Sequence, residues 1–591
     1  MYSEKRWVIT PGGDSARVEA ISQVHGISPI LAELLVQRGI DTPQSAYQFF
    51  NPSLEELHDP FLMRDMMVAV QRIEKALLSG ERIMVYGDYD VDGTTAVSLV
   101  YLFLKGIAPD PSQLLFYIPD RYAEGYGVSQ RGVDYANENN VSLVITLDCG
   151  IKAIEKVAYA KTLGIDFIIC DHHLPDEQLP EAVAVLDPKR LDCEYPFKEL
   201  SGCGVGFKLA QAFCMYREIS FDCIFPLLDL VVVSIASDIV PIVGENRIMA
   251  HYGLIQLNSE NVNKGLGAII RIAGLERHPI QIDDIIFKIG PRINAAGRME
   301  IEIDQDDPRA QSGGRTAVKL LTAPTPERAL YYVEQIDNFN QDRKSIDRNI
   351  TIEAHQIIER DRDFVNKRST VIYNPQWVKG VVGIVASRLI ESYYRPTVVL
   401  TMSNGMITGS ARSIPGFDLY QAVEHCSDLL ENFGGHTYAA GLTMRPENLD
   451  AFLEKFEKFV KENIDNETLT PQIKIDGAIT LSDITPKLRS DLLRFQPFGP
   501  GNPAPTFRST RVCDNGRARR VGANGDHLKM ELWQGVRPYS SISAIAFGQT
   551  RFASEIIGGH PIDVCFNLVE NHYQGNITPQ LRIRDIRLCQ R

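Results

Sequence analysis

The chain has 591 residues, of which 44% are hydrophobic and 23% charged; this is the composition of a soluble globular protein that is too long for one hydrophobic core. The formal net charge of −14 argues by itself against a nucleic-acid partner, because phosphate binding requires clustered Lys and Arg. The sequence has no C-x-x-C pair, which argues against a zinc ribbon. It also has no N-terminal signal-peptide core and no apolar run long enough to span a bilayer. These features argue against a membrane protein and predict a cytoplasmic protein.

The first 325 residues are predicted to form a helical region at 1–60 and an α/β domain at 61–325. Between about 80 and 240, helical stretches alternate with short apolar runs at 82–87, 114–118, 143–148, 167–171 and 183–187. These runs are apolar on both faces, which is typical of strands in a parallel sheet covered by helices. Because the carboxyl ends of such strands form the ligand crevice, Asp88, Asp148 and Asp171 are expected at one edge of a common sheet.

The remainder of the chain divides into three predicted segments. Residues 326–365 are charged with periodic apolar positions, which predicts a long, partly exposed connecting helix. A second αβ pattern covers 366–468, and short β-like segments broken by Gly, Asn and Pro then predict a small β-barrel or sandwich at 469–591. Residues 470–591 hold 16 Lys or Arg against 10 Asp or Glu, whereas the rest is acidic, which is a mild pointer to a C-terminal nucleic-acid module.

The densest chemical signal is GDYDVDGTTA at 87–96, where Asp88, Asp90 and Asp92 alternate ahead of a predicted helix. Close-set carboxylates repel each other without a cation, and hard divalent cations prefer carboxylate oxygens. An EF-hand loop begins with the same D-x-D-x-D-G pattern, but its twelfth position would be Leu99, and a buried strand precedes the motif instead of a helix. The motif is therefore interpreted as part of a different kind of metal site.

Further acidic segments follow: TLDCGI with Asp148, CDHHLP with Asp171, His172 and His173, and an apolar run, VVVSIASDIVPI, with Asp238 near its end. Each aspartate alone is more simply explained as a helix cap, and a His-His pair is more often structural. Together, the aspartates and the histidine pair at the ends of neighbouring strands favour a metal centre. Oxygen ligands with few nitrogens and no thiolates suit Mn²⁺ or Mg²⁺, and such a cluster suits two-metal hydrolysis of a phosphodiester.

In this order and spacing, the DYDVDG, DCG, DHH and ASD segments resemble motifs I to IV of the DHH phosphoesterase superfamily. The resemblance narrows to the RecJ exonucleases through RYAEGYG (121–127), GPRINAAGRM (290–299), GSARSIPGFDL (409–419), FGGHTYAAG (433–441) and FGPGNPAPTF (498–507). It covers the chain from about residue 20 to the end. It implies an α/β multidomain fold in which a DHH parallel-sheet domain and a DHHA1 α/β domain are joined by a long helix and followed by a C-terminal OB-like β-barrel.

The resemblance also implies roles for individual residues. The implied metal ligands, with Asp148 bridging, are Asp88, Asp90, Asp92, Asp148, His172 and Asp238. The implied catalytic residues are Asp90, Asp92, Asp148, Asp171, His172 and His173. The implied substrate-binding residues are Arg121, Tyr126, Arg292, Asn294, Arg298, Ser410, Arg412, Gly434, Gly435 and His436.

The residue types suit these implied roles. Ser410, Arg412 and Arg121 match a pocket for a 5′ phosphate, and arginine offers a planar fork for phosphate oxygens. The GGH motif at 434–436 matches the region of the scissile bond, where glycine permits close backbone approach. Tyr126 is suited to stack on a base without reading its sequence.

The activity that the resemblance implies is a metal-dependent 5′-to-3′ exonuclease that degrades single-stranded DNA to 5′-mononucleotides with two Mn²⁺ or Mg²⁺ ions. A monomer is expected because the sequence has no long heptad pattern and no large apolar helix face. Its implied setting is recombination and repair, with a helicase and a single-strand-binding protein as candidate partners. One alternative is a DHH phosphodiesterase acting on short oligonucleotides or cyclic dinucleotides, whose members usually lack a C-terminal barrel. Another is a non-catalytic DNA-binding scaffold, against which the intact acidic set argues. The acidic insert at 300–314 is interpreted as a solvated loop or as an altered partner surface.

Overall fold

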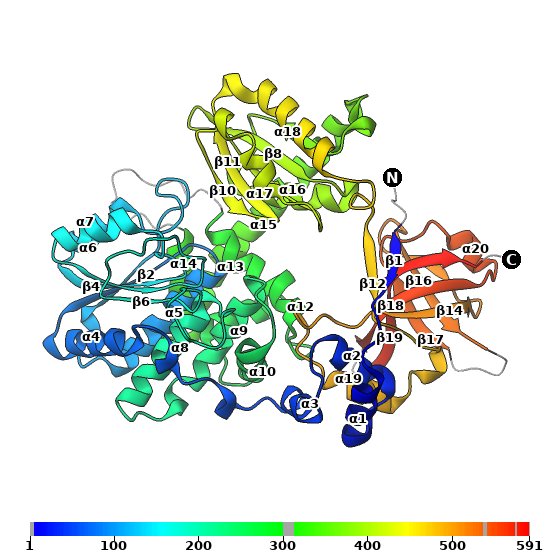
Figure 1. Ribbon diagram of the computed structural model, residues 1–591, viewed down its shortest axis with the longest axis horizontal. Coiled ribbons are helices and arrows are strands. Elements are labelled where there is room, and N and C mark those ends of the chain that lie inside the picture. The colour runs from blue at the N-terminus through cyan, green and yellow to red at the C-terminus, as the bar shows by residue number, and fades with distance from the viewer. Residues whose placement is uncertain (1–4, 299–312, 536–540, 574–575, 590–591) are drawn as a thin grey trace.

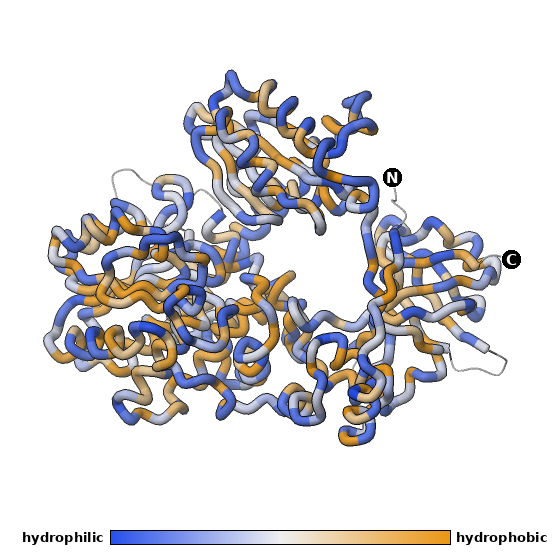
Figure 2. The backbone as a smooth tube through the Cα atoms, in the orientation of Figure 1, coloured by the Kyte–Doolittle hydropathy of each residue, from blue (hydrophilic) through white to orange (hydrophobic). Residues whose placement is uncertain are grey.

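The computed structural model describes residues 5–298, 313–535, 541–573 and 576–589, so the acidic insert up to residue 312 lies outside the described residues. Figure 1 shows a first α/β body, a second α/β body reached through a long helix, and a β-barrel next to which both chain termini lie. In Figure 2 the apolar residues concentrate along the strands of the sheets and on the helix faces that cover them. Within the described ranges, no helix combines the length and the apolarity needed to cross a membrane.

The first α/β body is built on a fully parallel five-stranded sheet in the order β3-β2-β4-β5-β6. Its strands are β2 (Arg82–Gly87), β3 (Leu114–Tyr117), β4 (Val141–Leu147), β5 (Asp166–Cys170) and β6 (Ala184–Leu186). Each lies within two residues of a predicted run, so the prediction of a parallel sheet is confirmed. Parallel strands need helical crossovers, and the helices of those crossovers bury both faces of the sheet.

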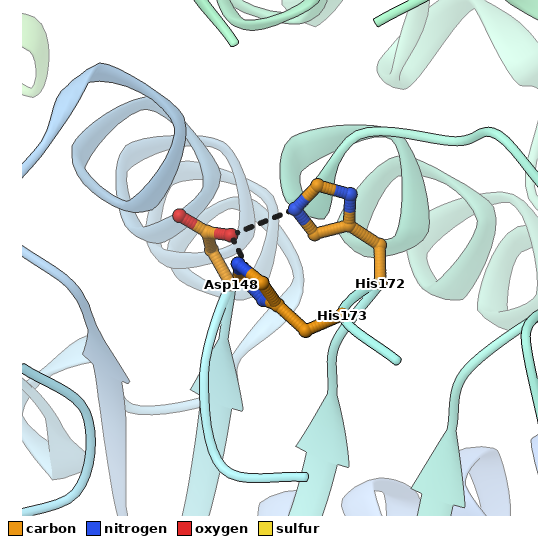
Figure 3. A group of neighbouring side chains, drawn as sticks. All are labelled: Asp148, His172 and His173. Carbon is orange, nitrogen blue, oxygen red and sulfur yellow. Dashed lines mark hydrogen bonds and ion pairs between the residues drawn. The ribbon is translucent and has the colours of Figure 1, made fainter. Parts of the chain in front are cut away.

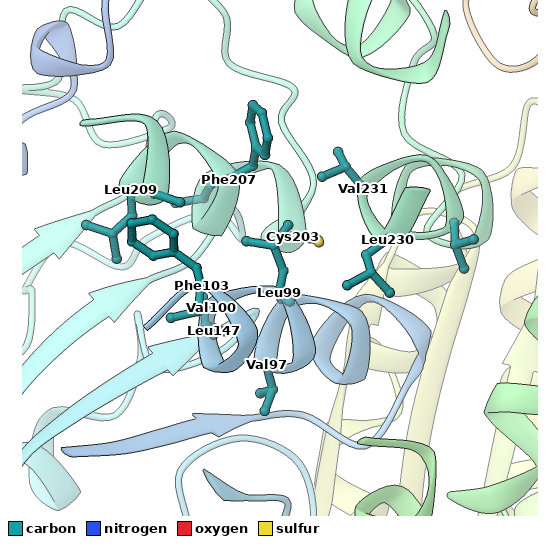
Figure 4. Close-up of a cluster of buried hydrophobic side chains, with 14 of the residues drawn as sticks. Val97, Leu99, Val100, Phe103, Leu147, Cys203, Phe207, Leu209, Leu230 and Val231 are labelled. Atoms are coloured by element: carbon teal, nitrogen blue, oxygen red, sulfur yellow. The ribbon is translucent and has the colours of Figure 1, made fainter. Parts of the chain in front are cut away.

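Helices cover the two faces of this sheet with separate apolar cores. One face packs against α4 (Met66–Ser79), α5 (Val91–Ile107) and α8 (Gly202–Tyr216), and the other against α6 (Gln130–Glu138) and α7 (Ile154–Thr162). Ile83 and Val85 face the first core, while Met84 and Tyr86 face the second, as the two-residue period of a strand requires. Figure 4 shows Leu99 and Phe103 of α5 beside Cys203 and Leu209 of α8.

The body continues as a set of helices. They are α9 (Leu228–Ser237), α10 (Gly244–Leu257), α11 (Lys264–Ile272), α12 (Ile282–Asp284), the π-helical segment η6 (Ile285–Ile289), α13 (Gly290–Ala296) and α14 (Gly313–Leu321). Helix α9 corrects one prediction, because Asp238 caps a helix and does not end a strand. The run before Asp238 is buried on every side, and a fully apolar run carries no period that separates a helix from a strand.

The predicted connecting helix is confirmed as α15 (Pro326–Arg360), which has 35 residues. Its first half places Val333 and Ile336 in the core of the first α/β body. Its second half places Ile350, Ala354 and Ile358 in a core with the second α/β body. The helix is therefore packed into both bodies and is not a free linker.

The second α/β body carries a five-stranded sheet in the order β10-β11-β9-β8-β7. Its strands are β7 (Thr370–Tyr373), β8 (Thr397–Ser403), β9 (Met406–Arg412), β10 (Asn432–His436) and β11 (Ala439–Met444). Its helices are α16 (Lys379–Tyr393), α17 (Leu419–Glu424) and α18 (Leu449–Asn463). The pair β7–β8 is parallel and the other pairs are antiparallel. Strand β11 lies between β9 and β10, so β10 is the edge strand of the sheet.

The C-terminal body is a barrel, because β14 pairs with both β18 and β16 and so closes the ring β14-β18-β19-β17-β16. Its strands are β12 (Gln472–Ile475), β13 (Gly477–Ala478), β14 (Phe507–Asp514), β15 (Arg519–Val521), β16 (His527–Trp533), β17 (Ile542–Ala546), β18 (Ile562–Tyr573) and β19 (Asn576–Leu588). Two short helices, α19 (Pro486–Leu493) and α20 (Ala553–Ile557), flank it. Closure removes the strand edges that an open sheet would expose.

The N-terminal segment packs on this barrel. It comprises β1 (Arg6–Ile9), α1 (Ser15–His25), α2 (Pro29–Gln37) and α3 (Pro43–Phe50). Strand β1 pairs in parallel with β12, and Ile21 and Leu31 share one apolar core with Phe495 and Phe507. The described residues of 5–50 and of 472–589 therefore form one packed unit, which local sequence patterns do not reveal.

Candidate functional site

The carboxyl ends of the central strands of the first α/β body bring three aspartates together. Asp88 follows β2, Asp148 follows β4 and Asp171 follows β5, and these strands are neighbours in the parallel sheet. All three side chains are buried. Asp148 has a φ of 57°, a left-handed conformation that is uncommon for a residue with a side chain and that collects at functional sites.

His172 lies between three carboxylates that come from different elements. Its Nε2 is 3.1 Å from Asp148 Oδ1 and 3.7 Å from both Asp92 Oδ2 and Asp238 Oδ2. Figure 3 shows the imidazoles of His172 and His173 turned toward the same Asp148 carboxylate. Burial lowers the pKa of His172, which favours the neutral imidazole that binds metal ions.

Asp92, in the first turn of α5, is held by the N-terminus of α8. It accepts hydrogen bonds from the backbone N–H groups of Gly202 (2.7 Å) and Cys203 (2.8 Å) and from Ser234 Oγ (2.7 Å). A Cβ on Gly202 would lie 2.6 Å from Asp148 Cβ, so only glycine allows this approach. The sequence prediction missed these residues, although a serine followed by small residues at a helix start (SGCGVG) was a usable signal.

Asp90 fits both roles that the sequence suggested for such an aspartate, a helix cap and a metal ligand. It caps α5, since its Oδ1 accepts the backbone N–H of Gly93 at 3.0 Å. Its carboxylate also belongs to the acidic cluster: burial, together with the charge of Asp92, raises its pKa. A helix cap and a metal ligand are therefore compatible roles for one aspartate.

The remaining carboxylates of the cluster have raised pKa values for the same causes. Burial raises the pKa of Asp88 and Asp148 well above the ordinary value, and neighbouring aspartates add to the effect. Asp238 is the most exposed of the set, yet burial of its carboxylate and the charges of Asp92 and Asp90 raise its pKa to about 8. Unpaired carboxylates this close are stable only if they bind protons or a cation.

The donor set fits a hard divalent cation. Among the described residues, ligand atoms converge in two groups, Asp148–His172–His173 and Asp92–His172–Asp238, in each of which all atoms lie within 4.8 Å of one another. The Oδ1 atom of Asp88 is buried without a hydrogen-bond partner in the described part of the chain. Carboxylate oxygens with an imidazole, and no thiolate, match the preference of Mn²⁺ and Mg²⁺.

Asp171 and His173 form a supporting pair behind the cluster. Asp171 accepts hydrogen bonds from His173 Nδ1 (2.7 Å) and from the backbone N–H groups of Ile151 (2.9 Å) and His172 (2.8 Å). Burial alone would raise the pKa of Asp171, but these bonds hold it below its usual value. For His173, burial is outweighed by the bond to Asp171, and the pKa rises to about 9.

Tyr126 contacts this pair from the exposed side. Its hydroxyl donates to the backbone carbonyl of Asp148 at 3.1 Å, and its ring meets the His173 ring edge to face at 5.9 Å. The side chain is 56% exposed, so one face of the ring remains available beside the cluster. Burial of its hydroxyl and the charges of Asp148 and Asp171 raise its pKa.

Three arginines converge where the two α/β bodies meet. Burial and the charges of Arg121 and Arg412 lower the pKa of Arg298 to about 9, and burial and Arg121 lower that of Arg412. Arg412 Nη1 donates to Ser410 Oγ and to the backbone carbonyl of Ala411, both at 2.8 Å. Like charges held this close, and still positive at neutral pH, form a site for an anion such as phosphate.

Two features join this arginine pocket to its surroundings. Arg121 lies over the ring of Tyr89 at 5.0 Å and acts electrostatically on Asp88, so it links the pocket to the acidic cluster. On the other side, a Cβ on Gly383 of α16 would lie 3.0 Å from Ser410 Oγ and 3.1 Å from Arg412 Nη2. Gly383 makes room for the pocket and was also missed from the sequence.

The other predicted substrate residues occupy different settings. Arg292 forms an ion pair with Asp337 of α15 at 2.9 Å, which ties α13 to the connecting helix. The side-chain carbonyl of Asn294 is buried without a hydrogen-bond partner among the described residues. The segment Gly434–His436 is the exposed end of β10 and pairs with β11. In the sheet of the second body, Gly434 lies opposite Gly441, Gly435 opposite Ala440 and His436 opposite Ala439.

Three known domain families match this chain in the order of its three bodies. Residues 82–235 match the DHH family, N-terminal domain. Residues 366–462 match the DHHA1 domain, and residues 475–585 match the RecJ OB domain. The predicted fold class, including the C-terminal barrel, is thereby confirmed.

Curated relatives match over nearly the full length. The chain is 35% identical over 588 residues to the single-stranded-DNA-specific exonuclease RecJ of Bacillus subtilis, which covers 99% of this chain and 71% of that protein. It is 31% identical over 578 residues to the protein of the same name from Escherichia coli, covering 95% of this chain and 96% of that protein.

A solved structure has the same fold. The crystal structure of RecJ from Thermus thermophilus in complex with Mn²⁺ superposes with a TM-score of 0.82 at 24% identity, and the match covers 100% of this chain and 81% of that one. The superposition extends to all three bodies, so their relative arrangement is shared and not only their separate folds.

Proposed function

The chain belongs to the RecJ family of single-stranded-DNA-specific exonucleases, and from this premise we propose that it is itself a metal-dependent exonuclease of single-stranded DNA. The observation that carries the proposal is the acidic cluster, in which five aspartates and His172 lie together: Asp88, Asp90, Asp92, Asp148 and Asp238. Burial and neighbouring carboxylates raise the pKa of Asp88, Asp90, Asp148 and Asp238. A cluster of this kind is costly to hold together unless it binds cations.

The proposed metal ligands are Asp88, Asp90, Asp92, Asp148, His172 and Asp238. When bound, two Mn²⁺ or Mg²⁺ ions supply Lewis acidity for in-line displacement at the scissile phosphate. The chain supplies the geometry: α8 fixes Asp92 through two backbone N–H groups, and Asp171 orients His173. His173, held by Asp171 beside the cluster, is placed to stabilise charge that develops on the phosphate.

The arginine pocket is proposed to bind the 5′-terminal phosphate. Arg121, Arg298 and Arg412 are positively charged neighbours at one end of the acidic cluster, and Ser410 adds a hydroxyl donor. An anchor for the terminal phosphate next to the hydrolytic centre would restrict cleavage to the first nucleotides from the 5′ end. This supports 5′-to-3′ polarity and the release of 5′-mononucleotides.

The barrel is proposed to hold the rest of the strand. Arg519 pairs with Lys529, Lys529 with Ile545 and Ile545 with Arg582 across β15, β16, β17 and β19. Directly opposed residues point to the same face, so the three cations form one row on the outside of the barrel. A basic row on such a barrel suits a phosphate backbone and favours long strands over the dinucleotide substrates of the alternative hypothesis.

The other substrate residues are proposed to contact DNA between these sites: Tyr126, Arg292, Asn294, Gly434, Gly435 and His436. We also propose the division into segments 1–60, 61–325, 326–365, 366–468 and 469–591. A cytoplasmic monomer that works with a helicase and a single-strand-binding protein completes the proposal. Size-exclusion chromatography with light scattering tests the monomer, and limited proteolysis tests the division.

The deciding experiment uses end-labelled single strands blocked at the 5′ or the 3′ end, with Mn²⁺. The wild type is expected to release mononucleotides only from strands with a free 5′ end. Asp148→Asn is expected to lose at least a thousandfold in rate, since it removes the buried carboxylate of one of the two ligand groups. The exposed Asp222→Asn is the control and should retain activity. Cleavage of dinucleotides without degradation of long strands would favour the alternative phosphodiesterase, and binding without any cleavage would favour the scaffold.

A further inference from the structure

An aromatic side chain is left exposed on a segment with an unusual backbone. Phe287 is 70% exposed, although Ile285 and Ile289 of the same π-helical segment η6 are fully buried. π-helical turns are rare and often occur at functional sites. The segment joins α12 to α13 and packs against α9, the helix whose C-terminal cap is Asp238 of the acidic cluster.

Phe287 lies close to a contact between the first α/β body and the barrel. Lys288 and Asp284 form an ion pair of 2.8 Å, so residues four apart share a face of this helical segment. Phe287 is four residues after Asp283, and the carboxylate of Asp283 lies 3.9 Å from Arg582 Nη1 on β19. Phe287 therefore lies one turn of the chain from the Asp283–Arg582 contact between the first α/β body and the barrel.

A second exposed aromatic lies on the barrel side of the same ion pair. The guanidinium of Arg582 is 5.8 Å from the ring centroid of Phe547, which is 52% exposed. The ring of Phe547 also meets His527 of β16 edge to face at 5.1 Å. Arg582 is the end of the basic row of the barrel, so Phe547 stands where that row reaches the first α/β body.

Cations continue from this junction to the arginine pocket. Arg292 Nη1 donates to the backbone carbonyl of Lys288 at 2.7 Å, immediately behind Phe287. Burial, and then the charges of Arg292 and Arg343, lower the pKa of Lys344 on α15, and Arg343 in turn lowers the pKa of Arg298. The cations nearest Phe287 are each paired with an aspartate, Lys288 with Asp284 and Arg292 with Asp337, so their side chains are fixed beside the exposed ring.

We infer that Phe287 and Phe547 form a stacking site for unpaired nucleobases at the junction between the barrel and the first α/β body. The inference rests on the proposed function, in which a single strand passes from the barrel to the acidic cluster. An aromatic face accepts any base, so the site grips the strand without reading its sequence. A duplex, whose bases are already stacked and paired, offers no free base to these rings, so the site also contributes to single-strand selectivity.

The test combines ring substitutions with a strand that lacks one base at a time. With the wild type, removing the base at one particular distance from the 5′ end is expected to raise KM, because a stacked base is lost. Phe287→Ala should raise KM for intact strands about 5- to 100-fold and should make the enzyme insensitive to that same abasic position. Phe287→Trp should restore KM and show tryptophan fluorescence quenching by oligothymidine, whereas Phe287→Leu should not restore KM. Phe547→Ala should act on the same or the adjacent position.

The matched control is Tyr47→Ala, an aromatic side chain of α3 that is 57% exposed on the outside of the barrel unit. It should leave KM and the abasic profile unchanged. If the wild type degrades single strands but Phe287→Ala and Phe547→Ala keep both its KM and its abasic profile, the stacking site is overturned while the exonuclease function stands. If Phe287→Leu behaves like the wild type, the site is an apolar contact and not a stacking site, which also overturns the inference. If the wild type does not degrade single strands, the proposed function itself has failed.

Discussion

The acidic cluster and the arginine pocket both crowd like charges, but they respond differently to the crowding. In the acidic cluster the strain appears as raised pKa values, to about 8 for Asp238, and as a buried oxygen of Asp88 without a partner in the described chain. In the arginine pocket the side chains are tied to neutral acceptors, as Arg412 is to the Ala411 carbonyl and Ser410 Oγ, and remain charged at neutral pH.

The difference follows from the chemistry of the two groups. A carboxylate becomes neutral when it binds a proton. Without metal ions, the acidic cluster therefore lowers the repulsion between its carboxylates by binding protons. A guanidinium does not lose its proton near neutral pH, so the arginine pocket stays positively charged and attracts an anion. The acidic cluster is thus suited to bind cations for hydrolysis, and the arginine pocket is suited to bind a phosphate next to it.

Substitutions in the residues that pack against the acidic cluster should lower activity the most. Gly202→Ala would place a Cβ 2.6 Å from the Cβ of Asp148 and 2.9 Å from its Cα, and backbone cannot move aside cheaply. We expect kcat to fall about a hundredfold, because small displacements of catalytic groups have effects of this size. Gly204→Ala, two residues along α8 with its nearest neighbour at 3.4 Å, is the control. Equal activity of the two variants would contradict the packing argument.

The arginine pocket should affect binding of the strand end more than the chemistry. Arg412→Ala is expected to lower kcat/KM about twentyfold on strands with a 5′ phosphate and much less on strands with a 5′ hydroxyl. Arg412→Lys should recover only part of the loss, since lysine lacks the planar fork. Arg445→Ala, which removes an exposed ion pair with Glu431 in the same body, serves as the control. A loss of equal size on both strand types would show that Arg412 does not recognise the phosphate.

The stability of the metal-free protein should report the charge state of the acidic cluster. Because folding raises the pKa of Asp238 from an ordinary value near 4 to about 8, the folded state binds the extra proton, and stability is expected to decrease as pH rises from about 4 to about 8. Differential scanning fluorimetry in EDTA should show the decrease, and Mn²⁺ at pH 8 should raise Tm by a few degrees. Asp238→Asn should make the decrease smaller, while Asp88, Asp90 and Asp148, whose pKa values are also raised, keep the rest of it. An unchanged profile in that variant would argue against the assignment.

The smallest loss of activity is expected for Gly383→Ala, because the side chains around this glycine in the arginine pocket can move. Gly383→Ala brings a Cβ to 3.0 Å from Ser410 Oγ and 3.1 Å from Arg412 Nη2, which are the far ends of side chains and can shift. We expect a two- to fivefold loss of kcat/KM on 5′-phosphorylated strands, against the hundredfold loss for Gly202→Ala. Gly106→Ala, where nothing lies within 4 Å of the new Cβ, is the open-space control. A loss as large as that of Gly202→Ala would mean that the arginine pocket is as rigid as the acidic one.

The sequence alone determined the features that depend on local pattern. Short apolar runs predicted the strands of the first sheet, because strands buried on both faces have few other compositions. The aspartates that end β2, β4 and β5 followed from those strands, and the charged, periodic stretch predicted α15. The order of the acidic motifs carried the family resemblance, and with it the barrel and the residues of the arginine pocket.

Only the tertiary structure decided what depends on contacts between distant segments. It made the run before Asp238 a helix, since a run buried on every side has no period to read. It brought the Gly202 backbone to Asp92 across 110 positions, and it joined the N-terminal segment to the barrel through β1 and β12. It also brought Arg298 of the first body next to Arg412 of the second. Such pairings are set by how whole surfaces fit together, and no window of local sequence records that fit.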